Sequence, residues 1–121
     1  MRVLIVDDST YIRSSLRTLL GNQGYEVVGE AKNGEMAIDL ALELKPDVIT
    51  LDNILPDMTG IDILKTLNAG EFNATVVMIS AVGQQSAIVD AMSNGAKHYL
   101  VKPFDDSELI AILKQLDEES I

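Results

Sequence analysis

The sequence predicts an α/β fold in which a doubly wound, five-stranded parallel sheet carries helices on both of its faces. Short apolar runs alternate strictly with longer segments whose apolar residues follow helical periodicity. This alternation favours parallel strands joined by right-handed helical crossovers. The short runs are almost continuously valine, isoleucine and leucine, which is typical of strands covered on both faces. A length of 121 residues and a hydrophobic content of 47% are sufficient for one domain with a core.

Ten elements are expected along the chain, beginning with a strand and ending with a helix. The predicted strands are short runs rich in β-branched residues and cover residues 2–6, 26–30, 48–51, 75–79 and 98–101. The predicted helices have an apolar stripe at helical spacing and cover residues near 10–21, 34–44, 60–68, 84–94 and 106–117.

Capping residues support the boundaries of these elements. Ser9 or Asp8 can cap the first helix, and Ser107 or Asp106 the last, because their side chains accept hydrogen bonds from free backbone N–H groups. The tail over residues 117–121 is expected to fray. Residues that end helices or block their continuation stand at the expected places: Gly24, Pro46 and Gly95.

Composition argues against several classes of function. The chain has no cysteine, which excludes disulfides, thiol catalysis and thiolate metal sites. A net charge of −10 argues against direct nucleic-acid binding, which needs a basic surface. No apolar stretch approaches the roughly 20 residues that cross a membrane, and the N-terminus does not resemble a signal peptide. We therefore expect a cytoplasmic protein without membrane insertion.

Charged side chains follow three of the predicted strands at the point where each strand ends. Asp7 and Asp8 follow the first strand, Asp52 the third and Lys102 the fifth. Parallel strands end at one edge of a sheet, where such folds bind ligands, so these groups should converge. Crowded carboxylates are relieved by Mg²⁺, which prefers oxygen ligands. We expect Asp8 and Asp52 to bind it directly, Asp7 to act through water, and the backbone carbonyl of Ile54 to be a further ligand.

The same edge suits phosphoryl transfer. A carboxylate beside a magnesium ion can attack phosphorus, and Asp52 is placed to do so. Lys102 could balance a second phosphoryl oxygen, and the hydroxyl of Ser80, at the end of the fourth strand, could donate to a third. Each residue alone has a structural explanation; Asp7 and Asp8, for example, could simply favour a helix N-terminus. Their joint occurrence at four strand ends favours phosphoryl chemistry.

Four motifs resemble the receiver domains of two-component response regulators. They are Val6-Asp7-Asp8-Ser9, the segment 51–60, Ser80-Ala81 and Lys102-Pro103-Phe104. The resemblance covers essentially the whole chain and implies a single receiver domain over residues 1–121. It also implies a flavodoxin-like sheet with the strand order 2-1-3-4-5, and a cis peptide bond between Lys102 and Pro103.

The resemblance also implies a role for each site residue. It makes Asp52 the phosphoacceptor, Asp7 and Asp8 the acidic metal pair, Ser80 the switch hydroxyl, Lys102 the phosphate-binding lysine and Tyr99 the switch aromatic. The chain departs modestly from the family pattern at Asn53 and Ile54, where an acidic residue and a methionine are more frequent. The protein is expected to be a signalling receiver that catalyses its own phosphorylation and dephosphorylation, and not an enzyme with separate substrates.

Within the family, residues 80–86 and 95–97 resemble the chemotaxis type found in bacteria outside the enteric group. This resemblance implies a histidine kinase of the chemosensory type as phosphodonor and a flagellar motor switch protein, or another target, as the output. A dedicated phosphatase is a further expected partner, and a monomer is the expected state.

The expected readout surface combines the helix 84–94, the strand that contains Tyr99 and the helix 106–117. It offers four small or apolar side chains of the helix 84–94: Ala87, Ile88, Val89 and Ala91. Near the site, Ile54 and Val82 should flank the path of a water that attacks the phosphoryl group. Neither apolar side chain can activate that water, so slow intrinsic dephosphorylation is predicted.

Three other readings fit part of the sequence. A phosphorelay intermediate or other single-domain regulator would use the same site and pass the phosphoryl group from Asp52 to a histidine. A flavodoxin-like enzyme or nucleotide-binding domain would need a glycine-rich loop after the first strand, where this chain has two aspartates. A receiver-like interaction module without phosphorylation is disfavoured by the intact acidic set.

Overall fold

The computed structural model describes residues 1–70 and 72–119 and contains one five-stranded parallel sheet in the order β2-β1-β3-β4-β5. The strands are β1 (Arg2–Val6), β2 (Glu26–Ala31), β3 (Val48–Leu51), β4 (Thr75–Ser80) and β5 (His98–Val101). The helices are α1 (Thr10–Asn22), α2 (Gly34–Leu44), α3 (Gly60–Asn68), α4 (Gln85–Ser93) and α5 (Asp106–Glu119). The predicted fold class and strand order are confirmed.

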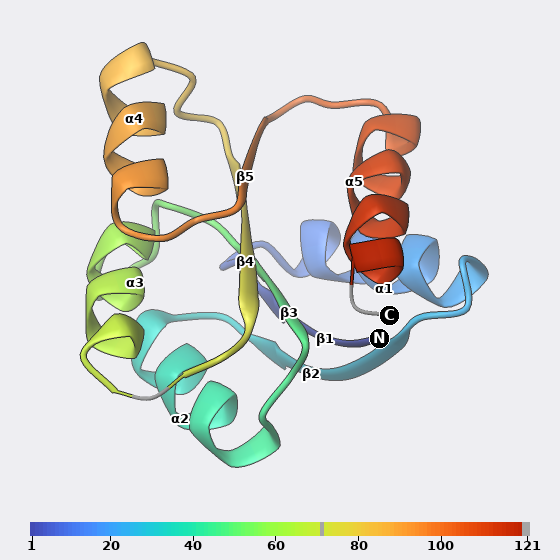
Figure 1. The fold of residues 1–121 in the computed structure, drawn as a ribbon, viewed down its shortest axis with the longest axis horizontal. Helices are drawn as coiled ribbons and strands as arrows, with labels where there is room; N and C mark the ends of the chain where they lie inside the picture. The colour runs from blue at the N-terminus through green and yellow to red at the C-terminus, as the bar shows by residue number, and fades with distance from the viewer. Residues whose placement is uncertain (71, 120–121) are drawn as a thin grey trace.

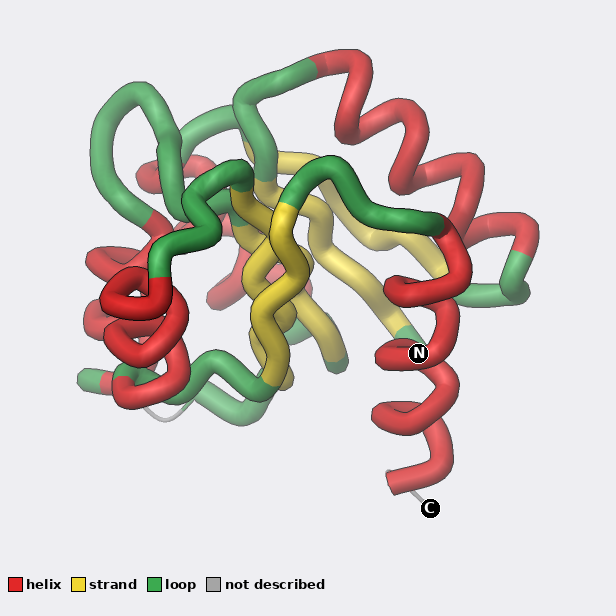
Figure 2. The backbone as a smooth tube through the Cα atoms, turned by 90° about the horizontal axis from the view of Figure 1, so that it is seen from above, coloured by secondary structure: helices red, strands yellow, loops and turns green. Residues whose placement is uncertain are grey.

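Helices cover both faces of the sheet, as a doubly wound fold requires. Helices α1 and α5 lie on one side of the strands, and α2, α3 and α4 lie on the other (Figure 1). Figure 2 shows the twisted strands between helices on either side. Strand β1 lies inside the sheet and pairs with β3 from Val3 to Val6, while its register against β2 shifts by one residue after Val3.

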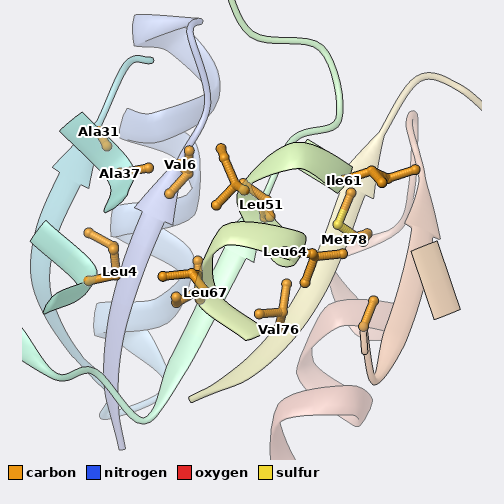
Figure 3. Close-up of a cluster of buried hydrophobic side chains, with 14 of the residues drawn as sticks. Leu4, Val6, Ala31, Ala37, Leu51, Ile61, Leu64, Leu67, Val76 and Met78 are labelled. Carbon is orange, nitrogen blue, oxygen red and sulfur yellow. The ribbon is translucent and has the colours of Figure 1, made fainter. Parts of the chain in front are cut away.

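The strands alternate their apolar side chains between two cores because successive residues of a strand point to opposite faces. Leu4 and Val6 of β1 join the core under α2, α3 and α4, whereas Val3 and Ile5 join the core under α1 and α5. Figure 3 shows the first of these cores, where side chains of α3 meet those of β3 and β4. Burial on both faces explains why the runs in the sequence are almost entirely apolar.

Most element boundaries agree with the predictions to within one residue; β2, β4 and α1 each continue one residue further than predicted. Helix α4 is one residue shorter at each end, because Gln84 and Asn94 are its caps. Helix α5 continues to Glu119, so the prediction of fraying from residue 117 is wrong for residues 117–119; residues 120 and 121 lie outside the described part of the chain. Glu119 is held by Gln115 of the same helix and by Lys97.

The cap predictions are confirmed for α1 and wrong for α5. The Ser9 hydroxyl accepts the backbone N–H of Ile12 at 3.2 Å, as an N-cap should. Helix α5 already includes Asp106 and Ser107, and the residue before it, Asp105, exchanges hydrogen bonds with Glu108 instead.

Candidate functional site

Three carboxylates converge where β1 and β3 end. Oxygen atoms of Asp7, Asp8 and Asp52 lie within 4.8 Å of one another. Asp7 and Asp52 are buried, whereas Asp8 is exposed. The backbone extends the sheet at this edge, because the N–H of Asp7 donates to Ala31 and that of Asp52 donates to Val6, each at 3.0 Å. The parallel pairing of β1 with its neighbours therefore brings the acidic residues together, as the sequence predicted.

Lys102 lies between the two buried carboxylates. Its Nζ is 2.7 Å from Asp7 Oδ2 and 3.3 Å from Asp52 Oδ2, and its side chain is 18% exposed. Burial lowers the pKa of this ammonium, but the hydrogen bond to Asp7 and the charges of Asp52 and Asp7 outweigh burial and leave the pKa raised. Lys102 is therefore held charged at the cluster. The Lys102–Pro103 peptide bond that follows is cis, as expected.

The surroundings of the Asp52 carboxyl group make its ionisation unfavourable. Burial raises its pKa above the ordinary value, and the charge of Asp7 adds to that effect. The backbone N–H of Ile54, 3.2 Å from Asp52 Oδ1, and the ammonium of Lys102 lower the pKa but do not cancel the rise. A cation or a covalent modification that removes this charge would thus be favoured.

The donor set fits Mg²⁺. The three aspartates of the cluster offer carboxylate oxygens, which are hard donors, and the exposure of Asp8 leaves one side of the cluster open to water. The part played by the Ile54 carbonyl stays a prediction; the Ile54 side chain is 57% exposed.

Ser80 and Tyr99 meet at the loop after β4. The buried Ser80 hydroxyl accepts the N–H of Val82 at 3.2 Å, and the Tyr99 hydroxyl donates to the carbonyl of Val82. Lys102 is tied to the same strand end, since its backbone N–H donates to the Ser80 carbonyl at 2.9 Å. Within residues 1–70 and 72–119, no hydrogen bond joins the Ser80 hydroxyl to the three carboxylates. Both predicted switch residues are therefore hydrogen-bonded to the same residue, Val82, in the loop after β4.

One residue of the expected readout surface is placed differently. Ala91 is fully buried and belongs to the core under α2, α3 and α4, so its prediction as surface is wrong. Ala87 and Ile88 are partly buried, and Val89 is 52% exposed. The face of α4 that Ala91 occupies packs against the sheet, which helical periodicity alone did not determine.

Two residues near the site were not singled out by sequence reasoning. Arg13 of α1 donates from Nη1 to the backbone carbonyl of Asp7 at 2.7 Å. Asp57, in the loop after β3, accepts the N–H groups of Gly34 and Glu35 at 2.7 and 2.9 Å, which lowers the pKa of its carboxyl. Asp57 thereby joins the loop after β3 to the start of α2. Its partners are over 20 positions away, so no local spacing could have indicated the contact.

Comparison with known proteins gives the class to which this fold and site belong. The family model of the response regulator receiver domain matches residues 3–114. The chain belongs to this family of signalling modules, whose members use Mg²⁺ at an acidic pocket. No helix among the described residues is both long and apolar enough to cross a membrane.

The relatives narrow the class to the CheY type. The chain is 42% identical over 117 residues to chemotaxis protein CheY of Thermotoga maritima, covering 97% of this chain and 98% of that protein. It is 44% identical to CheY of Bacillus subtilis, with 96% and 98% covered. A chain in the crystal structure of the CheX-CheY-BeF3-Mg complex from Borrelia burgdorferi superposes with a TM-score of 0.91 at 32% identity, covering 96% and 88%. The protein is therefore a CheY-like receiver domain.

Proposed function

We propose that the protein is a single-domain response regulator over residues 1–121 that a histidine kinase phosphorylates on Asp52 in a Mg²⁺-dependent reaction. The phosphorylated form changes its affinity for a target in chemotaxis signalling, with a flagellar motor switch protein as the leading target. The observation that carries this proposal is the buried Asp52 carboxylate, which lies beside the carboxylate of Asp7 and within reach of the Lys102 ammonium. We further propose that it acts as a monomer in the cytoplasm.

In the proposed reaction, an Asp52 carboxylate oxygen forms a bond to the phosphorus of the donor. The bond from phosphorus to the donor imidazole nitrogen breaks, and that nitrogen leaves with the electron pair. Mg²⁺ supplies positive charge to the carboxylates and phosphoryl oxygens when bound by Asp8 and Asp52, with Asp7 through water and the Ile54 carbonyl as a further ligand. The protein's own contribution is to hold these carboxylate oxygens close together at one edge of the sheet.

Lys102 and Ser80 are proposed to recognise the new phosphoryl group. Lys102 already faces Asp52 and can donate to a phosphoryl oxygen once that carboxylate carries the phosphoryl group as an acyl phosphate. The Ser80 hydroxyl accepts from Val82, so its own hydrogen remains available for donation to a second oxygen. The added charge of about −1.5 to −2 would draw both groups toward Asp52.

Val82 links Ser80 to Tyr99 through hydrogen bonds, and this link is proposed to transmit phosphorylation to the target-binding surface. Movement of Ser80 toward the phosphoryl group would pull on the N–H of Val82 and shift the carbonyl that Tyr99 binds. Tyr99 could then turn inward, and the surface formed by α4, β5 and α5 would change its fit to a target. The exposed side chains of Val89 and Met92 give this surface apolar anchors.

Dephosphorylation is proposed to depend on a dedicated phosphatase. Ile54 is exposed next to Asp52, Val82 follows Ser80 by two residues, and neither side chain carries a group that can orient water. A similar chain forms a complex with CheX in the presence of BeF3 and Mg. That complex supports a protein partner that recognises the activated form of this chain.

The test is Mg²⁺-dependent labelling by a small phosphodonor such as acetyl phosphate, followed by intact mass measurement. The wild type should gain one phosphoryl group, and Asp52→Asn should gain none. Asp39→Asn, which removes an exposed carboxylate on α2, is the matched control and should be labelled like the wild type. Removal of Mg²⁺ by a chelator should abolish labelling. Undiminished labelling of Asp52→Asn would contradict the proposal.

A further inference from the structure

The guanidinium of Arg13 reaches from α1 to the backbone behind the carboxylate cluster. Nη1 donates to the Asp7 carbonyl at 2.7 Å, and Nη2 lies 3.4 Å from the Thr10 hydroxyl. Nε lies 3.4 Å from a carboxylate oxygen of Glu30 on β2. The side chain is only 14% exposed, so its planar fork is held on three sides. The ion pair of Arg13 with Glu30 does not by itself require the guanidinium to contact the Asp7 carbonyl, and neither does the packing of α1.

The carbonyl that Arg13 binds belongs to the peptide that joins Asp7 to Asp8. The other polar groups of Asp7 are also taken: its N–H by Ala31, Oδ1 by the N–H of Ser9, and Oδ2 by Lys102. Because a peptide unit is planar, holding the Asp7 carbonyl also sets the direction in which the chain enters Asp8. Asp8 is exposed, so its orientation depends mainly on this backbone.

We propose that Arg13 is a positioning residue for the metal site: it holds the Asp7–Asp8 peptide so that the carboxylates converge on a cation. This inference rests on the Mg²⁺ site of the proposed function. Groups that orient metal ligands from behind typically change metal affinity by about 10- to 100-fold when removed. Arg13 is suited to the task because its fork has several donors in a rigid plane, which a lysine lacks.

Two effects of Arg13 on metal binding have opposite signs, which makes the inference testable. Its positive charge beside the cluster repels a cation, so a charge effect alone predicts tighter Mg²⁺ binding when the charge is removed. Positioning predicts weaker binding when the fork is removed, whether or not the charge is kept. Arg13→Lys keeps the charge and loses the fork, and Arg13→Met loses both.

Arg17 is a matched control on the same helix. It lies one turn after Arg13 and pairs with the same carboxylate, with its Nε 2.7 Å from Glu30 Oε2. Its side chain is 52% exposed, and no hydrogen bond or ion pair joins it to Asp7 among the described residues. Arg17→Lys therefore perturbs the shared pairing with Glu30 without touching the Asp7 carbonyl.

The experiment is calorimetric titration of the full chain with MgCl2 at constant pH and ionic strength, with thermal unfolding in the absence of Mg²⁺ measured for each variant. We expect Arg13→Lys and Arg13→Met to bind Mg²⁺ about tenfold more weakly than the wild type. The Mg²⁺ affinity of Arg17→Lys should stay within about twofold of the wild type. If the pairing of arginine with Glu30 were the cause of the effect, Arg17→Lys would lose affinity as well.

Three results would overturn the inference. Wild-type affinity in Arg13→Lys would show that the fork is not needed, and tighter binding by Arg13→Met would show that charge dominates. An equal loss in Arg17→Lys would assign the effect to the pairing with Glu30. In each of these three cases, binding of Mg²⁺ by the wild type would still agree with the proposed function. If the wild type itself binds no Mg²⁺, the proposed function fails, and this inference fails with it.

Discussion

The helices that follow β1, β2 and β3 each begin with a side-chain cap, whereas the helix that follows β4 does not. Ser9, Asn33 and Thr59 each accept a backbone N–H at the start of the helix that follows, and Thr59 does so within a capping box. Gln84, at the start of α4, makes no such hydrogen bond. The helix starts next to the carboxylates are therefore capped by side chains, whereas the helix start that follows Ser80 is not.

Burial of the two helices beside these loops shows the same contrast. Helix α3 buries five residues against the sheet: Gly60, Ile61, Ile63, Leu64 and Leu67. Helix α4 buries only Ala91. Apolar burial is the main term that holds a helix in place, and regions with little of it open at low free energy. This difference fits a switch in which the loops after β1 and β3 bind the metal and the phosphoryl group, and the loop after β4 moves together with α4.

Glycine substitutions should give the largest difference in stability between the loop after β3 and the loop after β4. A Cβ on Gly60 would lie 2.6 Å from the Asp52 backbone oxygen, and backbone cannot move aside. Gly60→Ala should therefore lower the free energy of unfolding by about 1–3 kcal/mol. A Cβ on Gly83, in the loop after β4, meets only side-chain atoms of the exposed Val101, the nearest being Cγ1 at 3.1 Å. Gly83→Ala should therefore change the free energy of unfolding by less than about 0.5 kcal/mol. Urea unfolding measures both; equal losses would contradict the contrast.

Polar side chains next to the site should speed dephosphorylation. Ile54→Asn combined with Val82→Glu places groups that can orient an attacking water on either side of Asp52. We expect the decay of the labelled phosphoprotein to accelerate by about tenfold, which corresponds to about 1.4 kcal/mol in the barrier. Single-turnover decay after removal of the phosphodonor measures this. An unchanged rate would show that these positions do not control the water.

A new cap should stiffen the side that now lacks one. Gln84→Asp provides a carboxylate that can accept backbone N–H groups at the start of α4 and should stabilise the protein by about 0.5–1 kcal/mol. The same cap should weaken the response of α4 to phosphorylation, because it holds the helix start in one position. Chemical unfolding gives the first effect and target affinity with and without phosphorylation gives the second. A stabilised variant whose response is undiminished would separate helix stiffness from switching.

The smallest expected effect concerns pH, because the causes acting on Asp52 partly cancel. Its raised pKa means that the folded state disfavours the charged carboxylate, so the penalty is absent below the ordinary value of 3.8 and appears as pH rises through the raised value. Asp52→Asn removes the penalty and should be the more stable form at neutral pH without Mg²⁺. The difference should shrink toward acid in unfolding curves across pH. A wild type that is the more stable form at neutral pH would refute this assignment.

Most of the fold and the main site residues could be predicted because their signals are local. Apolar runs marked each strand, and the residue after each run had to lie at one sheet edge once the strands were parallel. The strand order came from the family resemblance, because periodicity does not determine which strands are neighbours. Arg13 and Asp57 were missed since their partners depend on how α1 and α2 pack. Ala91 was misplaced because an amphipathic pattern in a short helix leaves its buried face ambiguous.

Hydrogen exchange with and without beryllofluoride and Mg²⁺ tests most directly whether phosphorylation of Asp52 changes the part of the site that is built on β4 and β5. We expect exchange to change in residues 80–94 and around Tyr99 and to change little in residues 60–68 of α3. In Asp52→Asn, beryllofluoride and Mg²⁺ should cause no change in either region. Changes confined to α3, equal changes in both regions, or a full response in Asp52→Asn would contradict this expectation.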